Sequence, residues 1–230
     1  MLLKFRTAVV MAAVLALPLA GHTAEKKSTE KKAVRTLFEI EQDDRIGFID
    51  VSGKVVVPPQ FKKARGGFTE GFVRVEQDGR WGFMELSGRI ITPRYDDNDD
   101  FSEGLARVKV NKQWAYVDHS GREVIAPRFE EAGNFHEGMA RVRLDDRWGF
   151  IDRSGRLVIE PRYKDADNFS EGLAGVKMES KWGFIDRTGK LIIEPRFSDA
   201  DNFKNGLSRV KVDRKLGYVN KKGTTVWQEK

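Results

Sequence analysis

The 230-residue chain contains no cysteine and only three histidines. The absence of cysteine excludes disulfide bonds, a lipid-anchored N-terminal cysteine and thiolate chemistry. After residue 24, no stretch has helical periodicity over more than about two turns, which argues against a helical core. The net charge of +6 is mild for this length and does not by itself favour a nucleic acid as partner.

The chain does contain a sequence repeat. The dipeptide Trp-Gly, or a variant of it, recurs at spacings of 33 to 35 residues. Its positions are Ile46-Gly47, Trp81-Gly82, Trp114-Ala115, Trp148-Gly149, Trp182-Gly183 and Leu216-Gly217. A turn glycine, a proline and aromatic residues follow in the same register. A tandem repeat of this period predicts one supersecondary unit whose copies are stable because they stack.

Each repeat contains three short segments that are typical of strands. Residues 105–110 (L-A-R-V-K-V) alternate apolar and polar side chains, and the later segments W-G-F-I-D and R-L-V-I-E are aromatic and β-branched. A less regular stretch then leads to the next repeat. We therefore expect an all-β protein of six three-stranded antiparallel meanders over residues 37–230, in an open, solenoid-like array. A closed six-bladed, propeller-like ring is the alternative.

The repeated unit W-G-F-I-D-x-x-G-x-x-V-I-x-P-x-[YF] resembles the WG-repeat, or KWG-repeat, family of bacterial proteins. Residues 181–183 give the K-W-G form itself. The sequence departs from the pattern at Ala115, where glycine is expected, and at Ile46 and Leu216, where tryptophan is expected. The resemblance implies a β-repeat module that is often exported, and it implies no general set of catalytic residues.

The first 24 residues have the layout of a secretory signal peptide. Lys4 and Arg6 form a basic start, residues 8–17 are apolar, and Pro18 is followed by small residues up to Ala24. This apolar run is shorter than the roughly 20 residues that span a bilayer. Residues 25–36 are charged and are expected to form a flexible linker. The prediction is a secreted or periplasmic protein of the bacterial envelope, with no transmembrane segment after cleavage.

Few residues are candidates for catalysis or metal binding. His119 and His136 occupy variable turn positions and are interpreted as solvated. An acidic or amide residue precedes each turn glycine and is interpreted as turn-forming, with glycoside hydrolysis as the alternative. The tract 96–100 (D-D-N-D-D) is interpreted as a solvated loop, with Ca²⁺ binding as the alternative. We expect no catalytic residue, no metal site and no cofactor.

Two sets of columns remain. The tryptophan column is expected to form the repeat core, with the glycine admitting a neighbour's ring; its residues are Trp81, Trp114, Trp148, Trp182, Gly82, Gly149 and Gly183. Basic residues of the first strand form a candidate binding stripe at Arg107, Lys109, Arg141, Arg143, Lys177, Arg209 and Lys211. A second basic column follows the proline at Arg94, Arg128, Arg162 and Arg196. Such stripes either bind an anionic polymer or pair with neighbouring carboxylates.

Together these patterns predict an exported, non-catalytic binding or scaffolding module. Its partner would be a protein or an anionic envelope polymer such as peptidoglycan or lipopolysaccharide. An envelope glycan hydrolase that uses Asp or Glu is one alternative, and a structural spacer is another. An enzyme should show one repeat that departs from the pattern with unusual polar residues, and the most divergent stretch is 95–119.

Overall fold

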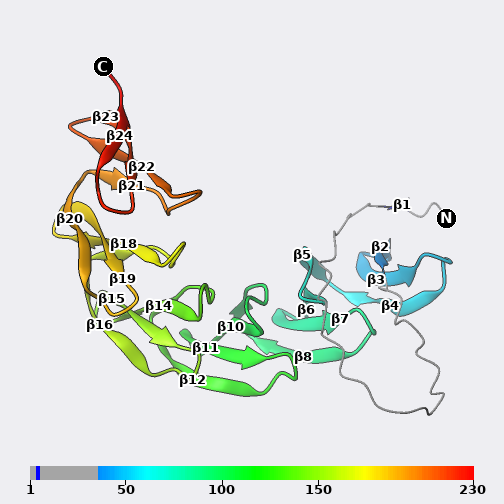
Figure 1. Ribbon diagram of the computed structural model, residues 1–230. Coiled ribbons are helices and arrows are strands. Elements are labelled where there is room, and N and C mark those ends of the chain that lie inside the picture. The colour runs from blue at the N-terminus through cyan, green and yellow to red at the C-terminus, as the bar shows by residue number, and fades with distance from the viewer. Residues whose placement is uncertain (1–3, 6–35) are drawn as a thin grey trace, which may run out of the picture. The chain divides into compact units, whose positions relative to one another are not determined.

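The computed structural model describes residues 4–5 and 36–230, and within them every regular element is a strand (Figure 1). The strands form six four-stranded antiparallel sheets, each made of strands consecutive in sequence. None of these sheets closes into a barrel, and the predicted all-β repeat array is confirmed. The signal peptide and linker predicted at 1–24 and 25–36 lie outside the described residues, except for Lys4, Phe5 and Thr36.

The six sheets are numbered here in chain order. Sheet 1 contains β1 (Lys4–Phe5), β2 (Leu37–Gln42), β3 (Arg45–Asp50) and β4 (Val55–Phe61). Sheet 2 contains β5 (Lys63–Thr69), β6 (Phe72–Gln77), β7 (Arg80–Glu85) and β8 (Ile90–Tyr95). Sheet 3 contains β9 (Asp97–Asn98), β10 (Leu105–Val110), β11 (Gln113–Asp118) and β12 (Glu123–Phe129).

The last three sheets have the same composition. Sheet 4 contains β13 (Glu131–Ala132), β14 (Met139–Leu144), β15 (Arg147–Asp152) and β16 (Leu157–Tyr163). Sheet 5 contains β17 (Asp165–Ala166), β18 (Leu173–Met178), β19 (Lys181–Asp186) and β20 (Leu191–Phe197). Sheet 6 contains β21 (Asp199–Ala200), β22 (Leu207–Val212), β23 (Lys215–Asn220) and β24 (Thr225–Gln228). No described segment forms a helix of the length and apolarity needed to cross a membrane.

The predicted meander corresponds to the last three strands of each sheet, and a fourth strand precedes it. In sheet 5 this strand is β17, where Asp165 pairs with Lys177 and Ala166 pairs with Val176. It lies in the stretch that the sequence suggested was irregular. With these two backbone pairings, the repeat has four strands, whereas three were expected. Four is the number typical of a propeller blade.

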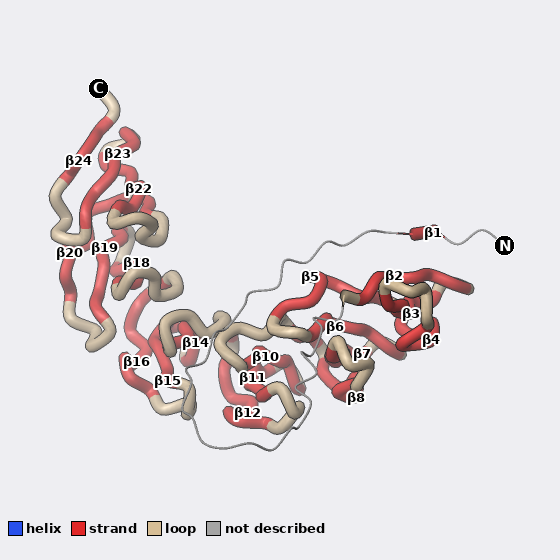
Figure 2. Tube along the Cα trace, turned by 45° about the vertical axis from the view of Figure 1, so that its right-hand side comes forward, coloured by secondary structure: helices blue, strands red, loops and turns tan. Residues whose placement is uncertain are grey.

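The chain divides into two compact units, Met1–Arg94 and Tyr95–Lys230. Sheets 1 and 2 belong to the first unit, apart from Tyr95, and sheets 3 to 6 to the second. Within the second unit, the four sheets follow one another in an open row (Figure 1 and Figure 2). Its hydrophobic clusters each draw residues from two successive sheets, so every sheet completes its neighbour's core.

The F-x-E-G loops connect successive sheets. The rings of Phe135 and Tyr116 meet edge to face with their centroids 4.9 Å apart, although the two residues belong to different repeats. Glu137 and Gly138 both have positive φ, 53° and 75°, which forms a tight turn. That turn is held by the backbone N–H of Gly138, which donates to Oε2 of Glu103 at 2.8 Å. Phe135 and Glu103 therefore stabilise the stack and not only their own loops. Glu137 and Glu171 accept the same bond from Gly172 and Gly206.

The glycine after each tryptophan is required for a different reason from the one predicted. A Cβ atom at Gly149 would lie 2.5 Å from the carbonyl oxygen of Ile159 and 2.7 Å from the nitrogen of Pro161. The pairing of β15 with β16 shifts register at this point, which is the mark of a β-bulge. The glycine therefore admits the backbone of the next strand, and the prediction that it admits a neighbour's ring is wrong.

Candidate functional site

The candidate site is built on the first basic column, beginning with Arg107 of β10. Its Cζ lies 4.6 Å from the ring centroid of Trp114, so the guanidinium stacks on the indole. Nη2 donates to Oδ2 of Asp99 at 2.6 Å, and Nη1 donates to the carbonyl of Ala132 in sheet 4. We call this arrangement of an indole face, a carboxylate and the next repeat's alanine carbonyl the arginine cradle.

The cradle varies from sheet to sheet. In sheet 4, Arg141 stacks on Trp148 at 4.9 Å and donates to the carbonyl of Ala166, but Gly133 replaces the carboxylate residue. Arg141 instead forms a long ion pair of 3.9 Å with Asp167 of sheet 5. In sheet 6, which carries no tryptophan at this column, Arg209 pairs with Asp201 at 2.8 Å and the arginine side chain is 51% exposed.

Sheet 5 keeps the rest of the cradle and lacks the arginine. The position that corresponds to Arg107 and Arg141 is Gly175. In the described part of the chain, the only cation over the ring of Trp182 is the ammonium of Lys177, at 5.9 Å. The sequence offered a signal for this feature, because the basic column skips position 175, but it did not indicate what the missing side chain would have contacted.

The other basic residues of the first strand differ in how they are neutralised. Arg143 pairs with Glu130 at 3.3 Å. Lys109 lies 5.3 Å from the ring centroid of Trp114. Among the described residues, Lys109, Lys177 and Lys211 have no carboxylate within ion-pair distance. The arginines of the predicted stripe therefore form ion pairs with carboxylates, whereas its described lysines do not.

The second basic column joins neighbouring repeats. Arg162 donates from Nη2 to the carbonyl of Gly189, 27 residues later, at 3.0 Å. Arg128 and Arg196 make the equivalent bonds to Gly155 and Gly223. Each guanidinium also lies about 5 Å from an adjacent aromatic ring, that of Phe129, Tyr163 or Phe197. These contacts give the column a role in stacking; Arg94, the first member, lies in the other unit.

The acidic column forms turns. Oδ1 of Asp118 accepts the backbone N–H of Ser120 at 2.9 Å and that of Arg122 at 3.1 Å. Hydrogen bonding from Ser120 lowers the pKa of Asp118 to about 2. The same bonds, led by Ser154 and Thr188, lower the pKa values of Asp152 and Asp186. A general acid in glycoside hydrolysis needs a raised pKa, so this column gives the hydrolase hypothesis no support.

The two histidines and the acidic tract 96–100 make contacts that support the local structure. His119 is exposed, with its ring edge-on to Phe101 at 4.7 Å, and His136 forms the backbone bridge to Met139. In the acidic tract, Oδ1 of Asp99 accepts the N–H of Asp100 at 2.9 Å while Oδ2 holds Arg107. No group of three or more His, Asp or Glu side chains within residues 36–230 is arranged to hold a metal ion.

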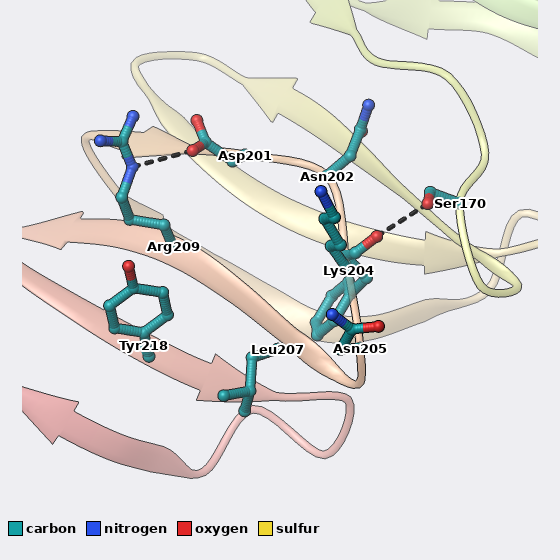
Figure 3. Close-up of a pocket in the computed structure, with 9 residues that line it drawn as sticks. Ser170, Asp201, Asn202, Lys204, Asn205, Leu207, Arg209 and Tyr218 are labelled. Atoms are coloured by element: carbon teal, nitrogen blue, oxygen red, sulfur yellow. Dashed lines mark hydrogen bonds and ion pairs between the residues drawn. The ribbon is translucent and has the colours of Figure 1, made fainter.

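Two hollows open beside the arginine column in sheets 5 and 6. One, of about 780 Å³, is lined by Asp201, Arg209 and Tyr218 among others; Figure 3 shows the ion pair of Arg209 with Asp201 and Tyr218 beside it. The other, of about 480 Å³, is lined by Arg141, Asp165, Asp167, Trp182, Asp199, Ala200, Asp201 and Asn202. The second hollow lies where the sheet-5 cradle lacks its arginine.

A family model described as WG containing repeat matches five consecutive stretches, at residues 46–81, 81–114, 114–148, 148–182 and 182–215. Together they cover well over half of the chain. The chain belongs to the WG-repeat family. Each match runs from one tryptophan position to the next, except that the last ends at residue 215, one residue earlier; each thus spans the end of one sheet and the start of the following one. No curated protein matches this WG-repeat chain.

Solved structures similar to this WG-repeat protein are propeller-like. One is a eukaryotic initiation factor, with a TM-score of 0.53 and 10% identity over 84% of this chain and 62% of that chain. Others are Hsv2p of Kluyveromyces lactis (TM-score 0.49, 12% identity, 80% and 71%) and PorZ of Porphyromonas gingivalis (TM-score 0.40, 10% identity, 82% and 30%). The similarity to the initiation factor shows a similar fold alone.

Proposed function

We propose that this WG-repeat protein is an exported, non-catalytic binding module that holds a partner protein along the face of sheets 5 and 6. The observation that carries the proposal is the pair of adjoining hollows on that face, which share Asp201 and Asn202. Their walls combine carboxylates, amides, arginines and aromatic rings. Such mixed surfaces, rich in aromatic residues and arginine, are typical of protein interfaces.

The distribution of charge favours a protein over an anionic polymer. Binding to a polyanion needs a surface of uncompensated cations. Here the arginines of the first column are held by Asp99, Asp167, Glu130 and Asp201. Four carboxylates and one guanidinium line the smaller hollow, so its local charge is negative. The unpaired lysines are the remaining basis for polymer binding, and the experiment must test them separately.

A pull-down from envelope extract of the source organism tests the proposal. The bait is the chain expressed from Met1, with Asn202→Trp as a variant because Asn202 lines both hollows. Val158→Trp is the matched control, since Val158 is exposed on β16 and lines neither hollow. We expect a discrete protein that the wild-type bait and the control retain and the Asn202 variant loses.

Purified peptidoglycan and lipopolysaccharide are tested with the same baits at low and moderate salt. Polymer retention that weakens with salt and disappears when Lys109, Lys177 and Lys211 become alanine would replace the protein partner with an anionic polymer. Failure to retain either a protein or a polymer would remove the binding proposal and leave the spacer hypothesis.

Export is a separate part of the proposal and rests on the N-terminal sequence pattern. Expression from Met1 in a Gram-negative host, followed by fractionation and N-terminal sequencing, tests it. We expect periplasmic or secreted protein that begins after residue 20, 21 or 24. Cytoplasmic protein with an intact N-terminus would contradict export.

A further inference from the structure

The repeats of this chain provide an internal comparison for one site. In sheet 3, the cradle of Trp114, Asp99 and the Ala132 carbonyl holds the guanidinium of Arg107 through stacking, an ion pair and a hydrogen bond. In sheet 4, a guanidinium again lies on the indole and bonds the next alanine carbonyl. A guanidinium is therefore the group that this arrangement of side chains and backbone accommodates.

The equivalent groups of sheet 5 are Trp182, Asp167 and the carbonyl of Ala200, and all three residues line the same hollow. The residue that would supply the guanidinium is Gly175. An added Cβ at Gly175 would meet Oδ2 of Asp167 at 3.4 Å and Cε3 of Trp182 at 3.6 Å, which are ordinary contacts. A side chain at this position would thus point between the carboxylate and the indole without a clash, as Arg107 does in sheet 3.

Arg141 of the preceding repeat does not complete this cradle. Its guanidinium stacks on Trp148 and reaches Asp167 only at 3.9 Å, compared with 2.6 Å between Arg107 and Asp99. Burial, more than any neighbouring charge, raises the pKa of Asp167. The carboxylates of Asp165, Asp199 and Asp201 raise it further, and Arg141 opposes them. The Asp167 carboxylate is accordingly less well compensated than its counterpart in sheet 3.

We propose that the sheet-5 cradle binds a guanidinium group supplied from outside the chain, seated on Trp182, paired with Asp167 and donating to the carbonyl of Ala200. The source is an arginine side chain of the partner or a free arginine-like molecule. This deepens the proposed function by naming the chemistry of the group that the face recognises. Gly175 pairs with Phe184 in the unshifted ladder of β18 and β19, so the absence of a side chain there leaves the strand pairing intact.

The geometry selects a guanidinium over other cations. A planar guanidinium can stack on an indole and still direct its N–H groups at a carboxylate and a carbonyl. An ammonium lacks that planar fork, and the chain's own ammonium at Lys177 lies 5.9 Å from the ring centroid. For a metal ion, the described carboxylates are not grouped closely enough.

Titration with short peptides tests the proposal on the full chain. The probes are acetyl-Gly-Gly-Arg-Gly-Gly-amide, the same peptide with lysine, and free L-arginine, followed by calorimetry and by the indole N–H signal of Trp182 in NMR spectra. We expect the arginine peptide to shift the Trp182 signal and to bind about tenfold tighter than the lysine peptide. Equal binding of the two peptides, or no binding of the arginine peptide at millimolar concentration, would overturn the proposal.

Substitutions locate the binding. Gly175→Arg places the chain's own guanidinium in the cradle and should weaken peptide binding about tenfold or more. Gly175→Ala is its matched control, since it adds only the tolerated Cβ and should leave binding unchanged. Asp167→Asn removes the carboxylate and should also weaken binding, which keeps the test decisive if the arginine variant does not fold. Unchanged binding in both Gly175→Arg and Asp167→Asn would show that the peptide binds elsewhere.

These experiments distinguish a protein arginine from a free arginine-like molecule, and they distinguish the guanidinium site from the proposed binding function. Tighter binding of the peptide than of free arginine assigns the guanidinium to a protein, and the reverse order assigns it to a small molecule. If a partner protein is captured by wild type and by Gly175→Arg alike but lost by Asn202→Trp, the binding function stands and the guanidinium site is wrong. If the arginine peptide binds while no protein is captured, the site stands and the protein partner is wrong.

Discussion

Sheets 3 and 5 have the same strands, the same turns and the same buried tryptophan, but the two tryptophans have different neighbours. Trp114 lies under Arg107 and Lys109, whereas among the described residues the one cation over the ring of Trp182 is Lys177, at 5.9 Å. Both indoles are at least nine-tenths buried, with exposed fractions of 5% and 8%. The repeat therefore does not need the arginine to form its sheet. What the arginine provides is a bond between repeats, and where it is absent a hollow of about 480 Å³ remains.

Gly149, which recurs after the tryptophan in other repeats, and Gly175, which replaces the arginine of its column, should tolerate alanine to different extents. Gly149→Ala should cost about 3 kcal/mol or more, because its Cβ would meet the Ile159 carbonyl and the bulge would have to open. Gly175→Ala should change stability by less than about 1 kcal/mol, because the added Cβ makes only ordinary contacts. Urea unfolding of the two variants measures both. Similar losses would mean that Gly175 is required by the backbone and is not an absent arginine.

The sequence predicted those parts of the fold that depend on neighbours in the chain. Alternation in 105–110 and the D-x-S-G turn each reflect a local preference, so the meander could be predicted. The strand β17 could not, since two residues show no periodicity and its pairing with β18 is a tertiary contact. The role of Gly149 was also missed, because the carbonyl that excludes a side chain there belongs to a bulge in the next strand.

The sequence predicted which arginines belong to the candidate site but not which groups they contact. The sequence aligned Arg107, Arg141 and Arg209 in one column, and the structure places all three in unit Tyr95–Lys230. It did not indicate that the guanidinium of Arg107 and that of Arg141 each have an indole beneath them and a carbonyl from the following repeat beside them. Those partners come from a different strand and, for the carbonyl, from a different sheet. Only stacking of the repeats brings them together.

A cradle without its arginine, like the sheet-5 cradle, can be made in sheet 3 by one substitution. Arg107→Gly removes the ion pair with Asp99, the stack on Trp114 and the bond to Ala132, and should cost about 2 kcal/mol. It should also create a second site, so that the arginine peptide binds with a stoichiometry near two. Calorimetry gives the stoichiometry and thermal unfolding the stability. Loss of stability without a second site would show that the sheet-5 hollow depends on more than the missing arginine.

The reverse change should make sheet 5 resemble sheet 3. In Gly175→Arg, the new guanidinium would gain the stack on Trp182 and a pair with Asp167, and a strand glycine would be removed. We expect a gain of about 1 kcal/mol and a higher melting temperature, measured by circular dichroism. Gly175→Lys is the control, since it adds charge and length without the planar fork. An equal gain from lysine would show that the planar guanidinium adds nothing beyond the positive charge and the loss of glycine.

The smallest effect concerns the turns, in which the two sheets agree. Asp118 and Asp186 make the same bonds to backbone N–H groups, and both have lowered pKa values, Asp118 falling from 3.8 to about 2 mainly through Ser120. Because the folded-state pKa of Asp118 lies below the unfolded value, its contribution to stability is present above about pH 4 and is lost between about pH 4 and 2. Asn220 makes the same backbone bonds at 3.0 Å with no charge to titrate.

Replacing Asp118 with asparagine should therefore keep the turn and flatten the acid dependence of stability, and Asp186→Asn should do the same to a similar small extent. The measurement is the urea midpoint of each variant and of the wild type between pH 2 and 6. Equal slopes for wild type and variants would mean that these carboxylates contribute as turn acceptors whether or not they are ionised. A larger response of Asp118→Asn than of Asp186→Asn would be traced to Arg122, whose Nε also donates to Oδ2 of Asp118 at 3.0 Å, because the bonds to backbone N–H groups are the part of the turn that the two sheets share.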